Sequence, residues 1–229
     1  MTEAFAPTST FEAGGDTVQI RCSTIADGDF HIEGPRAALL HRRTAFAPGV
    51  WTQLDEVHGT RVLTVHLPGE RDFAEGDALV TRQRGAVLAV WTGDCAPVVL
   101  AGDDGTLGAV HAGWRGAIDG VLQATVAVMA ASHVTAQLGP CIHPCCYEFG
   151  DADLGTFVDR FGSAVAGRTS WGTPALDMRA VVSAALDEVG VAVVDRSWCT
   201  GCHPERFFSH RRRQQLGRQV MTISKRAAA

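Results

Sequence analysis

Several features that mark particular classes of protein are absent from this 229-residue sequence. No apolar run approaches the roughly 18–20 uncharged residues that a membrane-spanning helix needs. Residues 1–15 lack the basic and then apolar segments of a secretory signal, which predicts a cytoplasmic protein. Lys225 is the single lysine and the net charge is −5, which argues against a general nucleic-acid-binding protein.

Cysteine is present, but in an odd number. Seven cysteines suit reduced thiols or metal ligands better than a disulfide framework. Hydrophobic residues make up 46% of the chain, which is ordinary for a globular protein with a sizeable core. The composition therefore predicts a globular protein that acts on a small molecule rather than on a nucleic acid or a membrane.

The spacing of apolar residues predicts both strands and helices. Residues 1–15 show no periodicity and are predicted to form a disordered leader before a single domain over residues 16–229. Because strands and helices do not alternate strictly, mixed sheets covered by helices are expected rather than a Rossmann fold. The predicted strands are 17–22, 61–66, 78–81, 86–92, 97–101, 107–112, 134–138, 191–195 and 219–224, and the predicted helices are 35–45, 115–131, 151–161 and 178–189, the last with Asp177 as N-cap.

A hairpin turn at Asp104-Gly105 brings two reactive side chains to the same end of a strand pair. Cys95 just precedes the first strand and His111 lies near the end of the second. A thiolate and an imidazole at that range suit zinc or copper. His58, before the turn residue Gly59, can supply a third ligand, and three protein ligands with an open fourth position are typical of catalytic zinc. Core packing remains the alternative for each residue.

Six motifs occur in the order in which they occur in a known family, and together they make the chain resemble it. They are Val57-His58-Gly59, Gly76-Asp77-Ala78-Leu79-Val80-Thr81, Asp94-Cys95-Ala96-Pro97-Val98, His111-Ala112-Gly113-Trp114-Arg115-Gly116, Leu138-Gly139-Pro140-Cys141-Ile142 with Cys145-Cys146-Tyr147-Glu148, and Phe207-Phe208-Ser209-His210-Arg211-Arg212. From residue 57 to about residue 224 the chain resembles the YfiH/YlmD family, also called the laccase-domain or polyphenol oxidase family.

The resemblance implies an α/β fold, a layered α/β/β/α sandwich with mixed sheets, similar to YfiH and to cytotoxic necrotising factors. It also implies that His58, Cys95 and His111 are both the metal-binding trio and the catalytic residues. Residues 23–50 depart from the family, because they lack its usual Ser-Leu-Asn-Leu-Gly-like stretch. Substrate contacts from that segment are therefore not implied.

Three activities follow from the resemblance. The first is a zinc-dependent purine nucleoside phosphorylase acting on adenosine, inosine or methylthioadenosine, with one zinc per chain and an adenosine deaminase side activity. The second is a copper polyphenol oxidase, but laccase chemistry needs several coppers and about ten clustered histidines, whereas nine scattered histidines are present. The third is a cysteine amidase that edits peptidoglycan precursors, with Cys95 as nucleophile and His111 as its base.

Arginines and acidic residues beside the motifs suggest further roles. A phosphorylase needs cations to hold phosphate, and Arg115, Arg211 and Arg212 are the candidates. Asp77 and Asp94 are predicted to orient metal ligands or exchange protons, or to cap turns. The expected partners are a nucleoside and phosphate, without nucleic acid or membrane, for a monomer or a small homo-oligomer.

The remaining cysteines include a second recognisable pattern. Cys199-Thr200-Gly201-Cys202-His203 matches c-type haem attachment, but attachment needs export and no export signal is visible. A redox pair usually opens a helix, whereas Pro204 follows here. We interpret these cysteines as buried structural thiols. A second zinc site that combines them with Cys141, Cys145 or Cys146 is the alternative.

Overall fold

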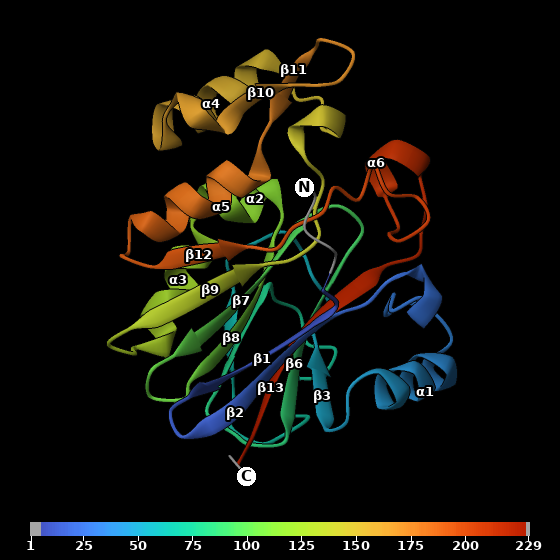
Figure 1. The fold of residues 1–229 in the computed structure, drawn as a ribbon, viewed down its shortest axis with the longest axis vertical. Coiled ribbons are helices and arrows are strands. Elements are labelled where there is room, and N and C mark those ends of the chain that lie inside the picture. The colour runs from blue at the N-terminus through green and yellow to red at the C-terminus, as the bar shows by residue number, and fades with distance from the viewer. Residues whose placement is uncertain (1–5, 228–229) are drawn as a thin grey trace.

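The computed structural model describes residues 6–227 and contains two mixed β-sheets with helices on their outer sides (Figure 1). The five-stranded sheet has the order β1 (Thr8–Ala13), β2 (Asp16–Cys22), β13 (Gln219–Ala227), β6 (Ala86–Thr92) and β3 (Val50–Gln53). The six-stranded sheet has the order β12 (Ala192–Asp195), β9 (Val134–Leu138), β7 (Ala96–Gly102), β8 (Leu107–Ala112), β5 (Ala78–Thr81) and β4 (Val62–Val65).

Three clusters of buried side chains separate four layers. Between the two sheets lie residues such as Ile20 and Leu88 from one sheet and Leu107 from the other. Helix α1 (Arg36–Phe46) covers the outer face of the five-stranded sheet, where Leu39 contributes to a cluster with Val87. The layers are therefore helix, sheet, sheet and helices, which confirms the predicted α/β/β/α sandwich with mixed sheets.

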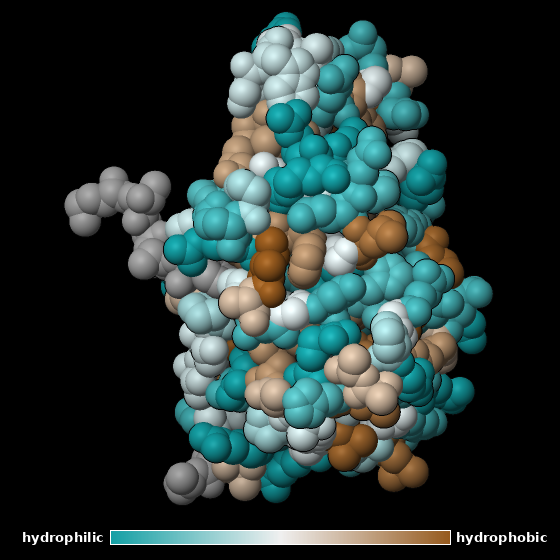
Figure 2. Space-filling model, turned by 90° about the vertical axis from the view of Figure 1, so that its right-hand side faces the viewer, coloured by the Kyte–Doolittle hydropathy of each residue, from teal (hydrophilic) through white to brown (hydrophobic). Residues whose placement is uncertain are grey.

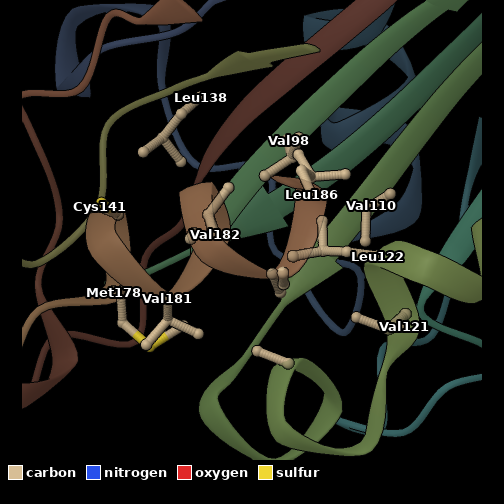
Figure 3. Packing of buried hydrophobic residues seen from close by; sticks show 14 of the residues in the cluster. Val98, Val110, Val121, Leu122, Leu138, Cys141, Met178, Val181, Val182 and Leu186 are labelled. Carbon is tan, nitrogen blue, oxygen red and sulfur yellow. The ribbon is translucent and has the colours of Figure 1, made fainter. Parts of the chain in front are cut away.

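The outer face of the six-stranded sheet carries the largest core cluster. It is covered by α2 (Trp114–Asp119), α3 (Val121–Met129) and α5 (Met178–Asp187). Figure 3 shows Leu122 of α3 and Leu186 of α5 beside Val98 and Val110 of the central strands. All four side chains are fully buried, so this face anchors the hairpin that carries Cys95 and His111.

The remaining elements lie at the end of the sandwich near α5 (Figure 1) or in connections. They are α4 (Asp151–Phe161), the hairpin of β10 (Ala166–Arg168) and β11 (Pro174–Leu176), α6 (His210–Arg213), and the 3-10 helices η1 (Ile25–Asp27), η2 (Pro144–Cys146) and η3 (Ser163–Val165). The predicted N-cap of α5 is confirmed, because the Asp177 side chain accepts hydrogen bonds from the N–H groups of Arg179 and Ala180.

The predicted hairpin is present, and its register places the reactive residues. β7 pairs antiparallel with β8, with Pro97 opposite His111 and Ala96 opposite Ala112. Cys95 directly precedes the last of these pairs. The expectation that Cys95 and His111 lie at the same end of the hairpin is therefore confirmed.

The prediction of a disordered leader over residues 1–15 is wrong for part of it. Thr8–Ala13 forms β1, in which all six residues pair antiparallel with β2. Its side chains are alternately exposed and half-buried, and the half-buried Phe11 and Ala13 pack against the core between the sheets. The strand therefore combines backbone pairing at a sheet edge with a short apolar pattern. Residues 1–5 of the predicted leader lie outside the described residues.

The prediction of a single helix over residues 115–131 is also wrong, because the chain forms two helices there. Gly120 has a left-handed backbone (φ +95°) and separates α2 from α3. Glycine adopts this conformation at little cost, so the chain changes direction there although the apolar spacing continues across it. Strand β3 was not predicted, and it is short and pairs parallel with β6.

The surface can be followed on one face of the molecule. On the face shown in Figure 2, hydrophilic side chains predominate and hydrophobic ones form small separated groups. Within residues 6–227, no helix has the length and hydropathy that crossing a bilayer requires.

Candidate metal centre

Three potential metal ligands from separate segments meet at the end of the β7–β8 hairpin. The ligand atoms of His58, Cys95 and His111 all lie within 4.8 Å of one another. Sγ of Cys95 is 3.8 Å from Nε2 of His58. Tetrahedral zinc with Zn–N bonds of about 2.0 Å and a Zn–S bond of about 2.3 Å would place these two atoms about 3.5 Å apart. The donor set therefore fits one ion with only a small adjustment.

A single buried carboxylate orients two of these ligands. Asp77 Oδ1 lies 2.9 Å from Nδ1 of His111, and the two oxygens of Asp77 accept the backbone N–H groups of His58 and Gly59, each at 2.8 Å. Burial raises the pKa of Asp77, but the hydrogen bonds from His111 and Gly59 outweigh it and the pKa is lowered. Asp77 therefore lies where carboxylates that orient metal-bound histidines are found.

The backbone near the trio adopts unusual conformations. His58 has a left-handed backbone (φ +62°) and Asp94 has φ +151°, both rare for residues other than glycine. A Cβ atom at Gly113 would lie 2.6 Å from Cδ2 of His58, and one at Gly116 would lie 2.5 Å from the carbonyl oxygen of Gly59. The small residues of the histidine motif therefore allow the His58 loop to approach β8.

Electrostatic interactions favour a thiolate at Cys95. Burial opposes ionisation, but the His111 and His58 side chains outweigh it and lower the pKa of Cys95 to about 6. Burial likewise opposes protonation of His111, but the Glu56 carboxyl and the Cys95 thiolate outweigh it and raise the His111 pKa. A thiolate beside imidazole suits either metal binding or nucleophilic attack.

The trio opens into a pocket of about 340 Å³ whose lining includes Arg115 and Arg211. The Arg115 guanidinium lies 4.1 Å from the ring centroid of Trp114. Arg211 lies 4.7 Å from the ring centroid of Tyr147, and its Nη1 donates to the carbonyl oxygen of Glu148 at 2.7 Å. Two of the three arginines predicted to contact phosphate thus border the same pocket as the trio.

The other two residues predicted from the motifs are Arg212, which lies outside the pocket lining, and Asp94, which belongs to it. Arg212 does not line the pocket, and its guanidinium lies 4.6 Å from the ring centroid of Trp171. Asp94 does line it and is buried; Oδ1 accepts from Oγ1 of Thr200 at 2.5 Å, and Oδ2 accepts from the N–H of Arg211 at 2.6 Å. Asp94 therefore fixes the start of α6, which carries Arg211.

Glu56 is a pocket residue that the sequence reasoning missed. Its Oε2 lies 3.6 Å from Nδ1 of His111 and its Oε1 accepts the N–H of Trp91 at 3.0 Å. Burial raises the pKa of Glu56 to about 8, against the attraction of His111. Glu56 lies two residues before His58 in the connection between β3 and β4, but its distance to His111 is set by the fold.

A comparison with protein families matches residues 23–226 to the family described as multi-copper polyphenol oxidoreductase laccase. The chain belongs to this family. The match covers the trio, the pocket arginines and the six-stranded sheet, and it begins after β2, within the segment that lacks the usual Ser-Leu-Asn-Leu-Gly-like stretch.

Individual relatives of the chain are named for a different activity from the one in the family's description. A purine nucleoside phosphorylase of Xylella fastidiosa is 40% identical over 210 residues, which cover 86% of this chain and 80% of the relative. The purine nucleoside phosphorylase YfiH of Escherichia coli is 36% identical over 205 residues, which cover 86% of this chain and 82% of the relative.

Solved structures support the fold. YfiH of Bacillus licheniformis is 22% identical with a TM-score of 0.80, covering 96% of this chain and 99% of that protein. YlmD of Geobacillus stearothermophilus is 26% identical with a TM-score of 0.74, covering 97% of this chain and 93% of that protein. The predicted likeness to the YfiH/YlmD family is therefore confirmed.

The family's description mentions several copper ions, and the potential ligands of this chain show whether it could hold them. Within residues 6–227, two groups can hold a metal: the trio, with two histidines, and a group of four cysteines without histidine. Laccase chemistry needs several coppers ligated by clustered histidines. The trio therefore fits a single ion, and this arrangement favours mononuclear chemistry over multi-copper oxidation.

Proposed function

We propose that this laccase family member is a zinc-dependent purine nucleoside phosphorylase with adenosine deamination as a side activity. The observation that carries the proposal is the shared pocket, in which the trio lies beside two arginines. The names of the relatives at 36–40% identity support the same reaction class. A volume of about 340 Å³ falls within the usual range for small-molecule sites, roughly 300–1,000 Å³.

Different residues of the pocket have different roles in the proposed phosphorolysis. Arg115 and Arg211 present guanidinium groups that can bind the phosphate nucleophile and hold it against the sugar. Trp91 and Tyr147 line the same pocket and supply aromatic surface against which a purine can pack. Phosphate then attacks the anomeric carbon, the glycosidic bond breaks, and the bond electrons leave with the base, which gains a proton.

The trio would hold the ion, with Asp77 fixing the orientation of His111 and the His58 backbone. Zinc bound there would supply a Lewis acid at one wall of the pocket. Deamination of adenosine uses water in place of phosphate, so the arginines are not needed for it. The two activities are therefore expected to respond differently to loss of an arginine.

The test is product analysis with and without phosphate. Inosine or adenosine should yield free base and ribose 1-phosphate only when phosphate is present, as measured by mass spectrometry. Equal base release in phosphate-free buffer would identify a hydrolase instead. No turnover of any purine nucleoside would contradict the proposal.

One observation favours a second candidate, a cysteine amidase acting on peptidoglycan precursors. Cys95 has a pKa lowered to about 6 and lies beside two histidines, as an activated nucleophile would. One thiolate cannot serve both as a tight zinc ligand and as a free nucleophile. Amidase activity that is retained after complete metal removal would support this candidate over the phosphorylase.

A further inference from the structure

Four cysteines form a second group of potential metal ligands outside the pocket. Cys145 and Cys146 belong to η2, whereas Cys199 and Cys202 belong to the loop after β12. Their sulfur atoms all lie within 4.8 Å of one another, and all four cysteines are free. Cys145 Sγ lies 3.9 Å from Cys146, 3.7 Å from Cys199 and 3.5 Å from Cys202, and Cys146 lies 3.4 Å from Cys202.

These separations are those of a tetrahedron around one ion. With Zn–S bonds of about 2.3 Å, tetrahedral geometry places each pair of sulfurs about 3.8 Å apart. The four separations given above run from 3.4 to 3.9 Å, and all six pairs lie within 4.8 Å. A disulfide would bring one pair to about 2.05 Å. A cluster of several irons would need wider spacing, because iron and sulfide lie between the cysteine sulfurs.

Burial does not account for the group. We interpreted the cysteines as buried structural thiols, but Cys202 is exposed and Cys145 is half-buried, so that interpretation is wrong for these two. Cys141 is buried and is not part of the group. Cys146 and Cys199 are buried at the edge of the core, but the exposed Cys202 and the half-buried Cys145 gain little from the hydrophobic effect, so the convergence of all four thiols needs another cause.

The surroundings suit a negatively charged tetrathiolate. The N–H of His143 donates to Sγ of Cys199 at 3.4 Å, as N–H groups do to zinc-bound thiolates. A Cβ atom at Gly201 would lie 2.7 Å from Cβ of Cys146, so glycine is required for the loop to come this close. The Arg212 side chain lies beside the same loop, since a Cβ atom at Gly201 would lie 2.9 Å from its Cγ.

We propose that Cys145, Cys146, Cys199 and Cys202 bind a structural zinc ion, separate from the ion at the trio. Four protein ligands leave no open position, which is the pattern of structural rather than catalytic zinc. Binding would release the thiol protons to solvent and join η2 to a loop more than fifty residues later in the chain.

The zinc would also hold in place two segments that contact the pocket residue Asp94. Thr200, between two of the cysteines, donates to the Asp94 carboxylate at 2.5 Å, and Ile142, just before η2, donates its N–H to the Asp94 carbonyl oxygen at 2.8 Å. Both joined segments therefore touch the residue that precedes Cys95. This inference concerns a different ligand set and stands without the proposed reaction.

The test uses the full chain with the trio disabled. Cys95→Ala, purified under reducing conditions, should retain about one zinc per chain by elemental analysis. X-ray absorption at the zinc edge should show four sulfur neighbours at about 2.3 Å and no nitrogen or oxygen. Adding Cys145→Ser and Cys202→Ser should bring the zinc content to zero, whereas adding Cys22→Ser, a buried cysteine outside both groups, should leave it at about one.

Three results would overturn the proposal. Cys95→Ala could hold no zinc and take up none from stoichiometric zinc chloride. Its zinc could show nitrogen or oxygen ligands. Mass spectrometry of the reduced-purified chain could reveal a disulfide within the group in place of the ion. Since Cys95→Ala leaves all four cysteines intact, these measurements decide the matter even if the triple variant does not fold.

Discussion

Nδ1 of His111 lies 2.9 Å from Oδ1 of Asp77, and the same carboxylate accepts the backbone N–H of His58. One buried side chain thus fixes the ring of one candidate metal ligand and the backbone of another. Because Nδ1 of His111 is held by Asp77, Nε2 is the ring nitrogen left for a metal. Asp77 itself is fully buried, so the arrangement does not depend on solvent.

We expect Asp77→Asn to weaken zinc binding at the trio by roughly 10- to 100-fold, the usual effect of losing a carboxylate partner of a metal-bound histidine. The amide keeps the size of the side chain but removes the charge that favours His111 as a ligand. The affinity should be measured by competition with a chromophoric chelator in a Cys145→Ser/Cys202→Ser background. Asp151→Asn, at an exposed position of α4, is the control and should change nothing. Equal affinities for the two variants would contradict the role given to Asp77.

Cys95→Ala should remove one equivalent of metal from the wild-type chain while leaving the fold intact. The residue is half-buried at the end of a strand, so the lost sulfur should cost only about 1 kcal/mol of unfolding free energy. Elemental analysis gives the metal content and thermal unfolding gives the stability. Cys22→Ala, a buried cysteine in β2, should show the opposite pattern, with full metal content and a lower Tm. Unchanged metal content in Cys95→Ala would show that another cysteine binds the ion.

The sequence predicted that Cys95 and His111 lie at one end of a hairpin because their geometry is local, whereas the trio with His58 rested mainly on the family resemblance. Cys95 and His111 belong to one hairpin, and the turn at Asp104-Gly105 fixes their register. Apolar periodicity similarly located most strands and helices, since buried faces repeat every two residues in a strand and about every 3.6 in a helix. The layered arrangement followed from the family resemblance, not from the pattern itself.

Features that depend on distant contacts were not predictable in this way. β1 has only Phe11 and Ala13 as inward apolar residues, and they pack against a core between the sheets that exists only in the fold. The convergence of Cys145 with Cys199 requires η2 and the loop after β12 to meet, and no spacing along the chain encodes that meeting. Glu56 was missed because its significance lies in its distance to His111, which only the fold reveals.

Stability at acid pH should depend on an ion pair far from the pocket. Lys225 Nζ lies 3.1 Å from Oδ2 of Asp16, and Arg84 donates to Oδ1 at 2.6 Å. Burial raises the pKa of Asp16, but the hydrogen bonds from Lys225 and Arg84 outweigh it, so the pKa lies below its ordinary value. A carboxyl whose pKa is lowered on folding stabilises the protein above its unfolded pKa, about 3.9, and this contribution is lost as the pH falls through the folded value.

Urea unfolding of the wild type between about pH 6 and pH 3 should therefore show a falling midpoint. Asp16→Asn should start lower at pH 6 and fall less steeply, because it has no carboxyl to protonate at this site. Parallel curves for the two proteins would show that Asp16 does not contribute to the acid sensitivity.

Arg211→Ala tests how phosphate is held. If Arg211 binds phosphate through charge-assisted hydrogen bonds, its loss should lower kcat/KM for phosphorolysis by about 100-fold, or about 2.7 kcal/mol, with the phosphate KM raised. Metal-dependent deamination of adenosine should be much less affected, because its nucleophile is water. Comparing both reactions in one variant separates loss of phosphate binding from general damage to the pocket.

Three further arginine variants show whether the effect is specific. Arg206→Ala removes an exposed guanidinium near Trp198, outside the pocket lining, and should leave phosphorolysis unchanged. Arg212→Ala distinguishes the sequence prediction from the pocket geometry. A phosphate contact would give the same loss as Arg211→Ala, whereas the position of Arg212 beside Trp171 predicts a much smaller loss.

Arg211→Lys should restore activity only in part, since an ammonium group cannot reproduce a two-pronged contact. If Arg211→Ala reduced deamination and phosphorolysis equally, the arginine would be shaping the pocket through Tyr147 and Glu148 rather than binding phosphate.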